Sequence, residues 1–338
     1  MREATIQKII DVKPVDNSDF LDVVIVLGWA VVTKRGDFKA GDYCVYIALD
    51  SIVPQKPEFE FLRKDNFRIR TKKLRGQLSQ GIIFPLDILN TDAIRILQND
   101  MNKEGCDVSE ALGVIHYEKP IPVEMKGLIR GNFPPYVPKT DENRIQNYPG
   151  VVDELKGIKV YSTCKMDGTS WTCVYHNGNF QVCTRNMSLK LEGNDDNIYV
   201  RMAKKYDLQN KLEKYGKNIA IQAELCGPGI QKNHIELKEH QLYVFNVYFI
   251  DERRYGNVKD IIEICVDFEI PMVPVLNIWE LKEGMVELLE MAEGYYEGTK
   301  NFREGIVIRP VEEMYSNVMK GRMSFKCLNN KYLVKHNE

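Results

Sequence analysis

The sequence predicts an α+β protein in which a small β-barrel or sandwich precedes a mixed domain built on an antiparallel-rich sheet. Three observations support this prediction. Short apolar, β-branched runs separated by turn signals fill residues 1–110. A proline-rich stretch follows, and beyond residue 151 strand-like runs mix with helical apolar stripes. With 338 residues, the chain is long enough for two domains that each have a core.

The composition is that of an ordinary globular protein, with 44% hydrophobic and 28% charged residues. The formal net charge of -2 excludes a uniformly basic chain, so any nucleic-acid site must be a local patch. The eight cysteines are scattered without a Cys-x-x-Cys pair, which argues against a zinc site and a disulfide framework. Neither a signal peptide nor a membrane span is expected. We expect a reduced, cytoplasmic or other intracellular location.

The first domain is predicted to span residues 1–115 and to be mostly β. Residues 21–34 form a long apolar run that breaks at Gly28, residues 43–49 form another, and a third ends at residues 82–84. Turn signals at residues 34–37 and 39–42 separate these runs. Spacing of this kind is typical of a small barrel.

Within this domain, residues 63–75 carry seven Lys or Arg in thirteen positions. Phe67 and Ile69 alternate with Arg68 and Arg70, so a strand here would bury the apolar pair and project both arginines into water. One interpretation is a solvated edge strand whose charges prevent sheet association. The other, which the negative net charge favours, is a phosphate-contacting face. It would use the following cations: Arg68, Arg70, Lys72 and Lys73.

Residues 116–150 are predicted to be a linker, because six of the fourteen prolines fall between positions 120 and 149. Near its end, Thr140 is a plausible N-cap for a short helix over residues 140–147. Arg144 is most simply a surface residue of that helix.

The second domain is predicted to span residues 151–338. Strands are expected over residues 219–225, 242–250, 305–308 and 324–328. Helices are expected where apolar residues share one face. One covers residues 258–268, with Ile261, Ile262, Cys265 and Phe268 inside, and the other covers 285–296, up to Tyr295 and Tyr296.

The residues Lys165-Met166-Asp167-Gly168 stand between two apolar runs. A lysine at a strand end, with an acid two residues later and a glycine to turn the chain, suits a nucleophile that attacks phosphorus. Such a lysine must be partly deprotonated, and a desolvated, cation-rich pocket would lower its pKa. The alternative is a surface hairpin with an ordinary lysine. The sequence has neither a Gly-x4-Gly-Lys-Ser/Thr loop nor a Gly-x-Gly-x-x-Gly fingerprint.

Six segments of the second domain are informative as a set. They are 165–168 (KMDG), 184–186 (TRN), 223–229 (AELCGPG), 242–246 (LYVFN), 303–310 (REGIVIRP) and 324–328 (SFKCL). In this order they resemble the covalent nucleotidyltransferase superfamily of polynucleotide ligases and mRNA capping enzymes. The extension 227–233 (GPGIQKN) looks like phage-type RNA ligases, and the β-rich module ahead resembles RNA ligases of the Deinococcus and Naegleria type.

This resemblance implies a fold and an activity. An OB domain would precede an antiparallel-sheet nucleotidyltransferase domain with an ATP-grasp-like ligase architecture. Lys165 would attack the α-phosphate of ATP and expel pyrophosphate, leaving a lysyl-AMP. The AMP would pass to the 5′-phosphate of an RNA end, and a neighbouring 3′-OH would displace it. The RNA would be a nicked duplex or broken ends, and the enzyme would act as a monomer.

The resemblance also implies site residues. Asp167, Glu224 and Glu304 would hold Mg²⁺ or Mn²⁺, mostly through water. The catalytic residues would be Lys165, Lys326, Glu224 and Glu304. The nucleotide would be bound by Cys164, Lys165, Arg185, Glu224, Phe245, Lys326 and Arg144. In one departure, phage-type ligases usually carry a second lysine two residues after the last motif lysine, and here that position is Leu328.

Three alternatives remain open at the sequence level. A DNA ligase and a GTP-dependent capping guanylyltransferase share the superfamily, but both usually carry an OB domain after the last motif, whereas twelve residues follow Lys326. The third alternative is a non-catalytic RNA-binding relic. It predicts loss of the nucleophile or of its acids, and all of them are present.

Overall fold

The computed structural model describes residues 2–16, 18–89, 104–117 and 127–336. The chain divides into two compact units, each described here by itself. The first comprises residues 1–120, 146–149 and 333–338, and the second comprises residues 121–145 and 150–332. Within the described ranges, no helix has the length and apolar character needed to cross a membrane.

The first unit is built on a five-stranded sheet with the order β3-β2-β1-β4-β8. Its strands are β1 (Ala4–Pro14), β2 (Leu21–Val26), β3 (Trp29–Lys34), β4 (Tyr43–Ile47) and β8 (Ile82–Phe84). The apolar run that breaks at Gly28 is thus a hairpin, β2–β3. The two end strands approach each other, because the N–H of Gln80, just ahead of β8, donates to the carbonyl of Ala30 on β3. The sheet therefore forms a nearly closed barrel, as predicted.

The described residues of this unit also form shorter elements. They are β5 (Ser51–Ile52), the 3₁₀ helix η1 (Pro57–Asp65), β6 (Lys72–Leu74), β7 (Gln77–Ser79), η2 (Leu86–Ile88), α2 (Ser109–Leu112) and β9 (Ile115–His116). Trp29, Ile6, Ile9, Ile47 and Phe59 are among the largest side chains of its core.

The basic segment 63–75 differs from its prediction. Phe67 and Ile69 are buried, as expected, but the chain around them is irregular and makes only an isolated bridge at Arg68. Arg68 does not project freely into water. Its guanidinium donates to Asp50 at 2.5 Å and lies 3.9 Å from the centre of the Tyr117 ring, which leaves the side chain 18% exposed. The negative charge of Asp50 and the aromatic ring of Tyr117 hold this arginine side chain within the fold.

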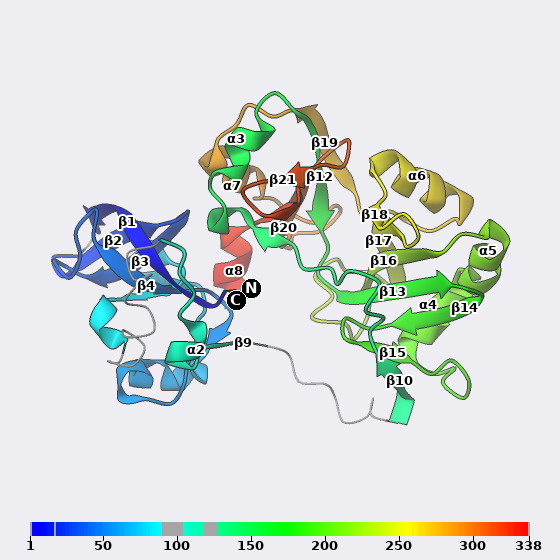
Figure 1. Ribbon diagram of the computed structural model, residues 1–338, viewed down its shortest axis with the longest axis horizontal. Coiled ribbons are helices and arrows are strands. Elements are labelled where there is room, and N and C mark those ends of the chain that lie inside the picture. The colour runs from blue at the N-terminus through cyan, green and yellow to red at the C-terminus, as the bar shows by residue number, and fades with distance from the viewer. Residues whose placement is uncertain (1, 17, 90–103, 118–126, 337–338) are drawn as a thin grey trace. The chain divides into compact units, whose positions relative to one another are not determined.

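The second unit contains a seven-stranded sheet with the order β10-β15-β14-β13-β16-β17-β18 (Figure 1). Its strands are β10 (Ile129–Asn132), β13 (Thr169–His176), β14 (Asn179–Cys183), β15 (Met187–Leu189), β16 (Ile219–Cys226), β17 (Gln241–Phe249) and β18 (Arg254–Tyr255). All its neighbouring strands run antiparallel.

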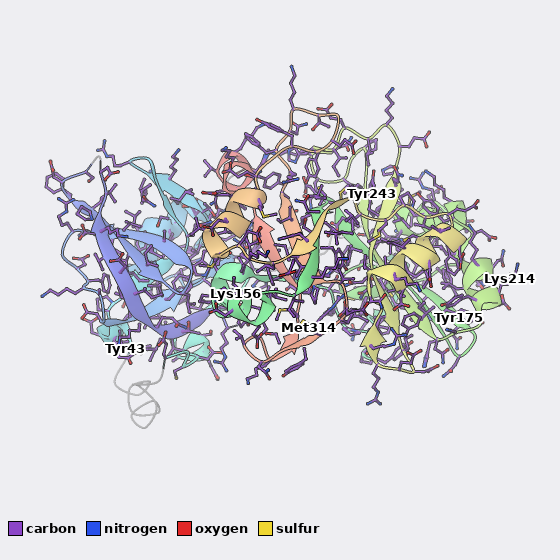
Figure 2. The ribbon with its side chains drawn as sticks, turned by 90° about the horizontal axis from the view of Figure 1, so that it is seen from above. Tyr43, Lys156, Tyr175, Lys214, Tyr243 and Met314 are labelled. Atoms are coloured by element: carbon purple, nitrogen blue, oxygen red, sulfur yellow. The ribbon has the colours of Figure 1, made fainter. Side chains whose placement is uncertain are left out.

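Three helices share one core with this sheet: α4 (Ile198–Lys205), α5 (Leu208–Tyr215) and α6 (Val258–Asp267). In Figure 2, the label of Tyr175 marks strand β13 of this sheet, and the label of Lys214 marks helix α5. Helix α6 was predicted, and Asn257 begins it with a capping box. Ile262 was wrongly placed inside, since it is 46% exposed.

The other sheet of this unit has five strands in the order β11-β23-β20-β12-β19. They are β11 (Asn143–Arg144), β12 (Lys159–Lys165), β19 (Val275–Glu280), β20 (Gly305–Pro310) and β23 (Phe325–Leu328). In its described residues this unit also has α3 (Val151–Leu155), α7 (Met285–Met291), β21 (Tyr315–Ser316) and β22 (Gly321–Arg322). Two elements, η4 (Ile145–Asn147) and α8 (Asn330–His336), begin in this unit, and their later residues belong to the first. Helix α7 is shorter than predicted, so that Tyr296 is buried beyond its end while Tyr295 is exposed.

The segment predicted as a linker is more than a connection. Residues 118–126, which hold two of its prolines, lie outside the described ranges. Farther along, it supplies the edge strand β10 to one sheet and β11 to the other. The predicted helix over residues 140–147 is absent, because residues 143–144 pair in parallel with β23 and only residues 145–147 form a 3₁₀ turn. Long-range strand pairing has overridden the local capping signal of Thr140.

Candidate active site

Lys165 is the last residue of β12, at the point where this strand leaves its neighbour β20. Strand β12 lies inside the sheet, between β19 and β20, and its side chains from Val160 to Cys164 are buried. The β-branched and aromatic run predicted this strand. The Lys165 side chain is 25% exposed, so its amine sits at the edge of the core and can still meet a ligand.

The amine of Lys165 donates to the Glu304 carboxylate at 2.7 Å. Burial alone would lower the pKa of Lys165, but Glu304, Glu224 and Asp167 outweigh burial and raise this pKa above its ordinary value. The prediction of a cation-rich pocket that lowers the lysine pKa is therefore wrong for this structure. The pocket around the amine is acidic, because strands distant in sequence converge on it.

Asp167 lies just after β12, where it is 8% exposed. Its carboxylate is 2.6 Å from Nδ1 of His234. His234 packs edge-on against Tyr332, with ring centres 5.7 Å apart, and its carbonyl accepts a hydrogen bond from Asn301. Asp167 is thus oriented by a histidine that follows the 227–233 segment directly.

Glu224 occupies β16, and the N–H of Gly168 donates to its carboxylate. Burial raises the pKa of Glu224 to about 8; Lys165 opposes this rise, while Glu304 and Asp167 add to it. Gly168 is required sterically, because a Cβ there would lie 2.4 Å from the carbonyl oxygen of Leu225. The glycine lets the turn after the lysine approach β16 closely.

Cations gather on the neighbouring strand pair β11–β23. Arg144 and Lys326 are register partners across this parallel pair, so they lie side by side on adjacent strands. Burial, and then the positive charges of Arg144 and Lys165, together lower the pKa of Lys326 to about 8. Asp141 links this pair to a third cation: it lies 4.0 Å from Lys326 and accepts from Arg185 at 3.1 Å.

Phe245 and Cys164 are near the same lysine. Both belong to a small apolar cluster that also holds Met166, Cys226 and Tyr296. Phe245 is partly buried, whereas Cys164 is 6% exposed and burial raises the pKa of its thiol to about 11. An unreactive thiol and a half-covered ring form an apolar wall beside the charged groups.

The acids fit a divalent cation. Three acids act on the single ammonium of Lys165, so acidic groups are in excess, and Glu304 and Asp167 add to the rise that burial causes in the pKa of Glu224. Among the described residues, no three His, Cys, Asp or Glu side chains are grouped to ligate a metal directly. Mg²⁺ usually keeps several of its waters, and such a hydrated ion suits separated carboxylates.

Behind the cations lies a buried polar network. Arg309 on β20 is 2% exposed and donates to Glu142 at 2.7 Å, to the carbonyl of Phe245 at 2.8 Å and to Ser324 at 2.8 Å. Glu142 is two residues ahead of Arg144. The ion pair therefore ties the segment that carries Arg144 to the central strand of the sheet.

The structure brings nearly all of the predicted site residues together. Asp167, Glu224 and Glu304 act on Lys165, and Lys326 lies close enough to feel its charge. Arg144 pairs with Lys326 across the strand register, and Arg185 joins this group through Asp141. The expected RNA-contacting residues lie in the first unit, where Lys72 pairs with Asp65 at 2.7 Å and Lys73 is exposed. Sequence reasoning missed the roles of His234, Asp141, Tyr296 and the Glu142–Arg309 pair, because their partners are distant in sequence.

Comparisons with known proteins show which proteins the chain is similar to. A family model described as an OB-fold domain matches residues 3–86, and one described as RNA ligase matches residues 158–328. The chain is 32% identical to a variant of Naegleria gruberi RNA ligase in a structure with AMP and Mn, with a TM-score of 0.87 and 99% of each chain covered. A structure of a variant with ATP and Mn gives the same values, and one with PPi gives 31%, 0.86 and 99% of each chain. No curated protein matches the chain.

Proposed function

The chain belongs to the RNA ligase family and is an ATP-dependent enzyme that forms phosphodiester bonds, and we propose that Lys165 is the nucleophile that accepts AMP. The observation that carries this proposal is the position of the Lys165 amine, 2.7 Å from Glu304 and close to Lys326. Acids and cations thus flank one amine, as phosphoryl transfer to a lysine requires.

In the first step, the Lys165 amine attacks the α-phosphorus of ATP, a P–N bond forms, and pyrophosphate leaves. Lys326, Arg144 and Arg185 would bind the phosphate oxygens, where their charges stabilise the transition state. Phe245 would stack on the adenine beside Cys164. Strand β23 supplies Lys326 but no second lysine, because Leu328 stands at that position. Arg144, the register partner of Lys326 on β11, would supply the second positive charge.

The amine must lose a proton before it attacks, yet the surrounding acids stabilise its protonated form by raising its pKa. We assign Asp167, Glu224 and Glu304 to a hydrated Mg²⁺ or Mn²⁺, which when bound would supply positive charge that offsets these acids and the α-phosphate. This chain's own contribution is to keep the three carboxylates oriented, through His234 at Asp167 and Gly168 at Glu224.

In the later steps, the RNA 5′-phosphate takes AMP from Lys165, and a 3′-OH then attacks the activated phosphorus and expels AMP. We propose that the substrate is nicked duplex RNA or broken RNA ends, and that the protein acts as a monomer in the cytoplasm. The eight free thiols support a reducing compartment.

The first test is chemical. The protein is mixed with α-labelled ATP or α-labelled GTP and Mg²⁺, without RNA, and label that survives denaturation is measured. We expect label from ATP and none in Lys165→Ala. Label from GTP would indicate capping chemistry. No label from either nucleotide, with the protein folded, would indicate an RNA-binding relic.

A second test addresses RNA contact by the first unit, where we propose that Arg68, Arg70, Lys72 and Lys73 form the contacting face. Arg68 is held by Asp50, so its reversal would also disturb the fold, and Lys73→Glu is the cleaner change. We expect weaker RNA binding with unchanged self-adenylylation. Lys39→Glu makes the same charge change at an exposed lysine outside the basic segment. Equal RNA affinity of the two variants would remove this face from the substrate site.

A further inference from the structure

Tyr296 lies where two strands of the active site separate. The ladder between β12 and β20 ends at the pair of Lys165 and Gly305. Just past this pair, the Tyr296 hydroxyl donates to the carbonyl of Lys165 at 3.2 Å and accepts from the N–H of Glu304 at 3.1 Å. One side-chain oxygen therefore connects the main chains of the proposed nucleophile and of the acid that contacts it.

The ring that carries this hydroxyl is held firmly. It is 3% exposed and packs in the cluster with Cys164, Met166 and Cys226. The N–H of Tyr296 donates to the carbonyl of Asn301 at 3.0 Å, and its own carbonyl accepts from Thr299. Burial, and then the charge of Glu304, raise the pKa of Tyr296, so the hydroxyl keeps its proton and remains a donor.

Glu304 is fixed on its other side as well. Its carbonyl accepts from the N–H of Asn329 at 2.9 Å, and the neighbouring Arg303 donates to the carbonyls of Met291, the last residue of α7, and of Glu293 just beyond it. The N–H of Glu304 has Tyr296 as its partner. The Tyr296 hydroxyl and the N–H of Asn329 thus hold the main chain of Glu304 from both sides, and the same hydroxyl connects it to the main chain of Lys165.

We propose that Tyr296 is a positioning residue for lysine adenylylation. Its hydroxyl fixes the separation of the Lys165 and Glu304 main chains, and so sets the place from which the lysine amine attacks the α-phosphorus. Tyr296 itself touches no substrate. This inference rests on the proposed function, because it concerns the same step. Misplacement of a reacting group by about 1 Å can cost about a hundredfold in rate.

The test is Tyr296→Phe, which removes the hydroxyl and keeps the ring. Single-turnover formation of the lysine–AMP bond is measured over a range of ATP concentrations with Mg²⁺, at a temperature where circular dichroism shows each protein folded. We expect the maximal rate to fall about tenfold or more while the ATP concentration for half-maximal rate stays within about twofold, the pattern of a lost interaction in the transition state. Because the rate constant reports only folded molecules, partial unfolding would lower the amplitude instead.

The matched control is Tyr46→Phe. Tyr46 is 2% exposed in the core of the first unit, and its hydroxyl donates to the carbonyl of Gln80 at 3.3 Å, so this change also removes a buried hydroxyl that binds main chain. A maximal rate of Tyr296→Phe within twofold of wild type would overturn the proposal, as would an equal loss in Tyr46→Phe or an effect confined to ATP binding. Absence of label in wild type would instead refute the proposed function, and this inference with it.

Discussion

The buried pair of Arg309 and Glu142 allows a quantitative prediction. Arg309→Met removes the guanidinium, which is 2% exposed and makes three hydrogen bonds of 2.7 to 2.8 Å, and leaves the Glu142 carboxylate without its ion-pair partner at 2.7 Å. Breaking one side of such a pair costs about 3–5 kcal/mol of unfolding free energy. Glu142→Gln keeps an acceptor for Arg309 and should cost less, about 2 kcal/mol. The double variant should cost less than the sum by about 1–3 kcal/mol, because the two groups interact directly.

Urea unfolding at pH 7 measures these free energies, with the slope compared across variants to check that the unfolded state is unchanged. Burial would raise the pKa of Glu142, but Arg309 and Arg322 outweigh it and hold the pKa below its usual range. A carboxylate whose pKa is depressed in the folded state stabilises the fold above its unfolded pKa, and this stability is lost as the pH falls through the folded value. The difference between wild type and Glu142→Gln should therefore shrink below about pH 4. Additive single costs, or single costs below about 1 kcal/mol, would refute the reasoning.

Three further predictions concern the charges at the site. Lys165→Arg should keep the ion pair with Glu304 and the melting temperature, yet lose lysine–AMP formation by about a thousandfold or more, since arginine does not give up its proton; retained label would contradict the assignment. Lys326, whose pKa is lowered to about 8, should lose its proton as the pH rises through that value, so the affinity of the free enzyme for ATP should decline above pH 8. Calorimetric titration at pH 7 and 9.5 checks this decline, and Lys326→Arg should abolish it. Asp141→Asn removes the carboxylate that contacts Arg185 and lies near Lys326, so ATP should bind about fivefold more tightly, in keeping with ~1 kcal/mol for an exposed ion pair. Weaker binding would mean that Asp141 orients these cations.

The strands and the six motif segments could be predicted because the information is local. Apolar runs such as 219–225 and 305–308 fill strands that are buried on both faces, so their residue types alone identify them. The family resemblance that the motifs carry then indicated the residues near Lys165. It also indicated Arg144, which the structure places on a strand and not on a helix. Residues 143–144 take strand form through β23, and no signal within a few residues could indicate that pairing.

The electrostatic character of the site could not be predicted, because pKa values depend on which charges converge. The sequence indicates a reactive lysine but not that Glu304, 139 positions away, would accept a hydrogen bond from it and raise its pKa. The same holds for His234 beside Asp167 and for Arg68, which Asp50 and Tyr117 draw into the fold of the first unit. Each is a contact between distant segments that a residue pattern does not encode.

The strand order β11-β23-β20-β12-β19 in the second unit has a consequence for folding. The nucleophile's strand β12 pairs with β19 and β20, which follow it by more than a hundred residues, whereas β13 to β17 of the other sheet pair mostly with near neighbours in the chain. Contacts between distant segments form late and slowly. A chain in which only the seven-stranded sheet has formed would leave Lys165 an ordinary lysine that ATP cannot modify. A lysine–AMP bond would therefore be a covalent record that folding of this unit had reached completion.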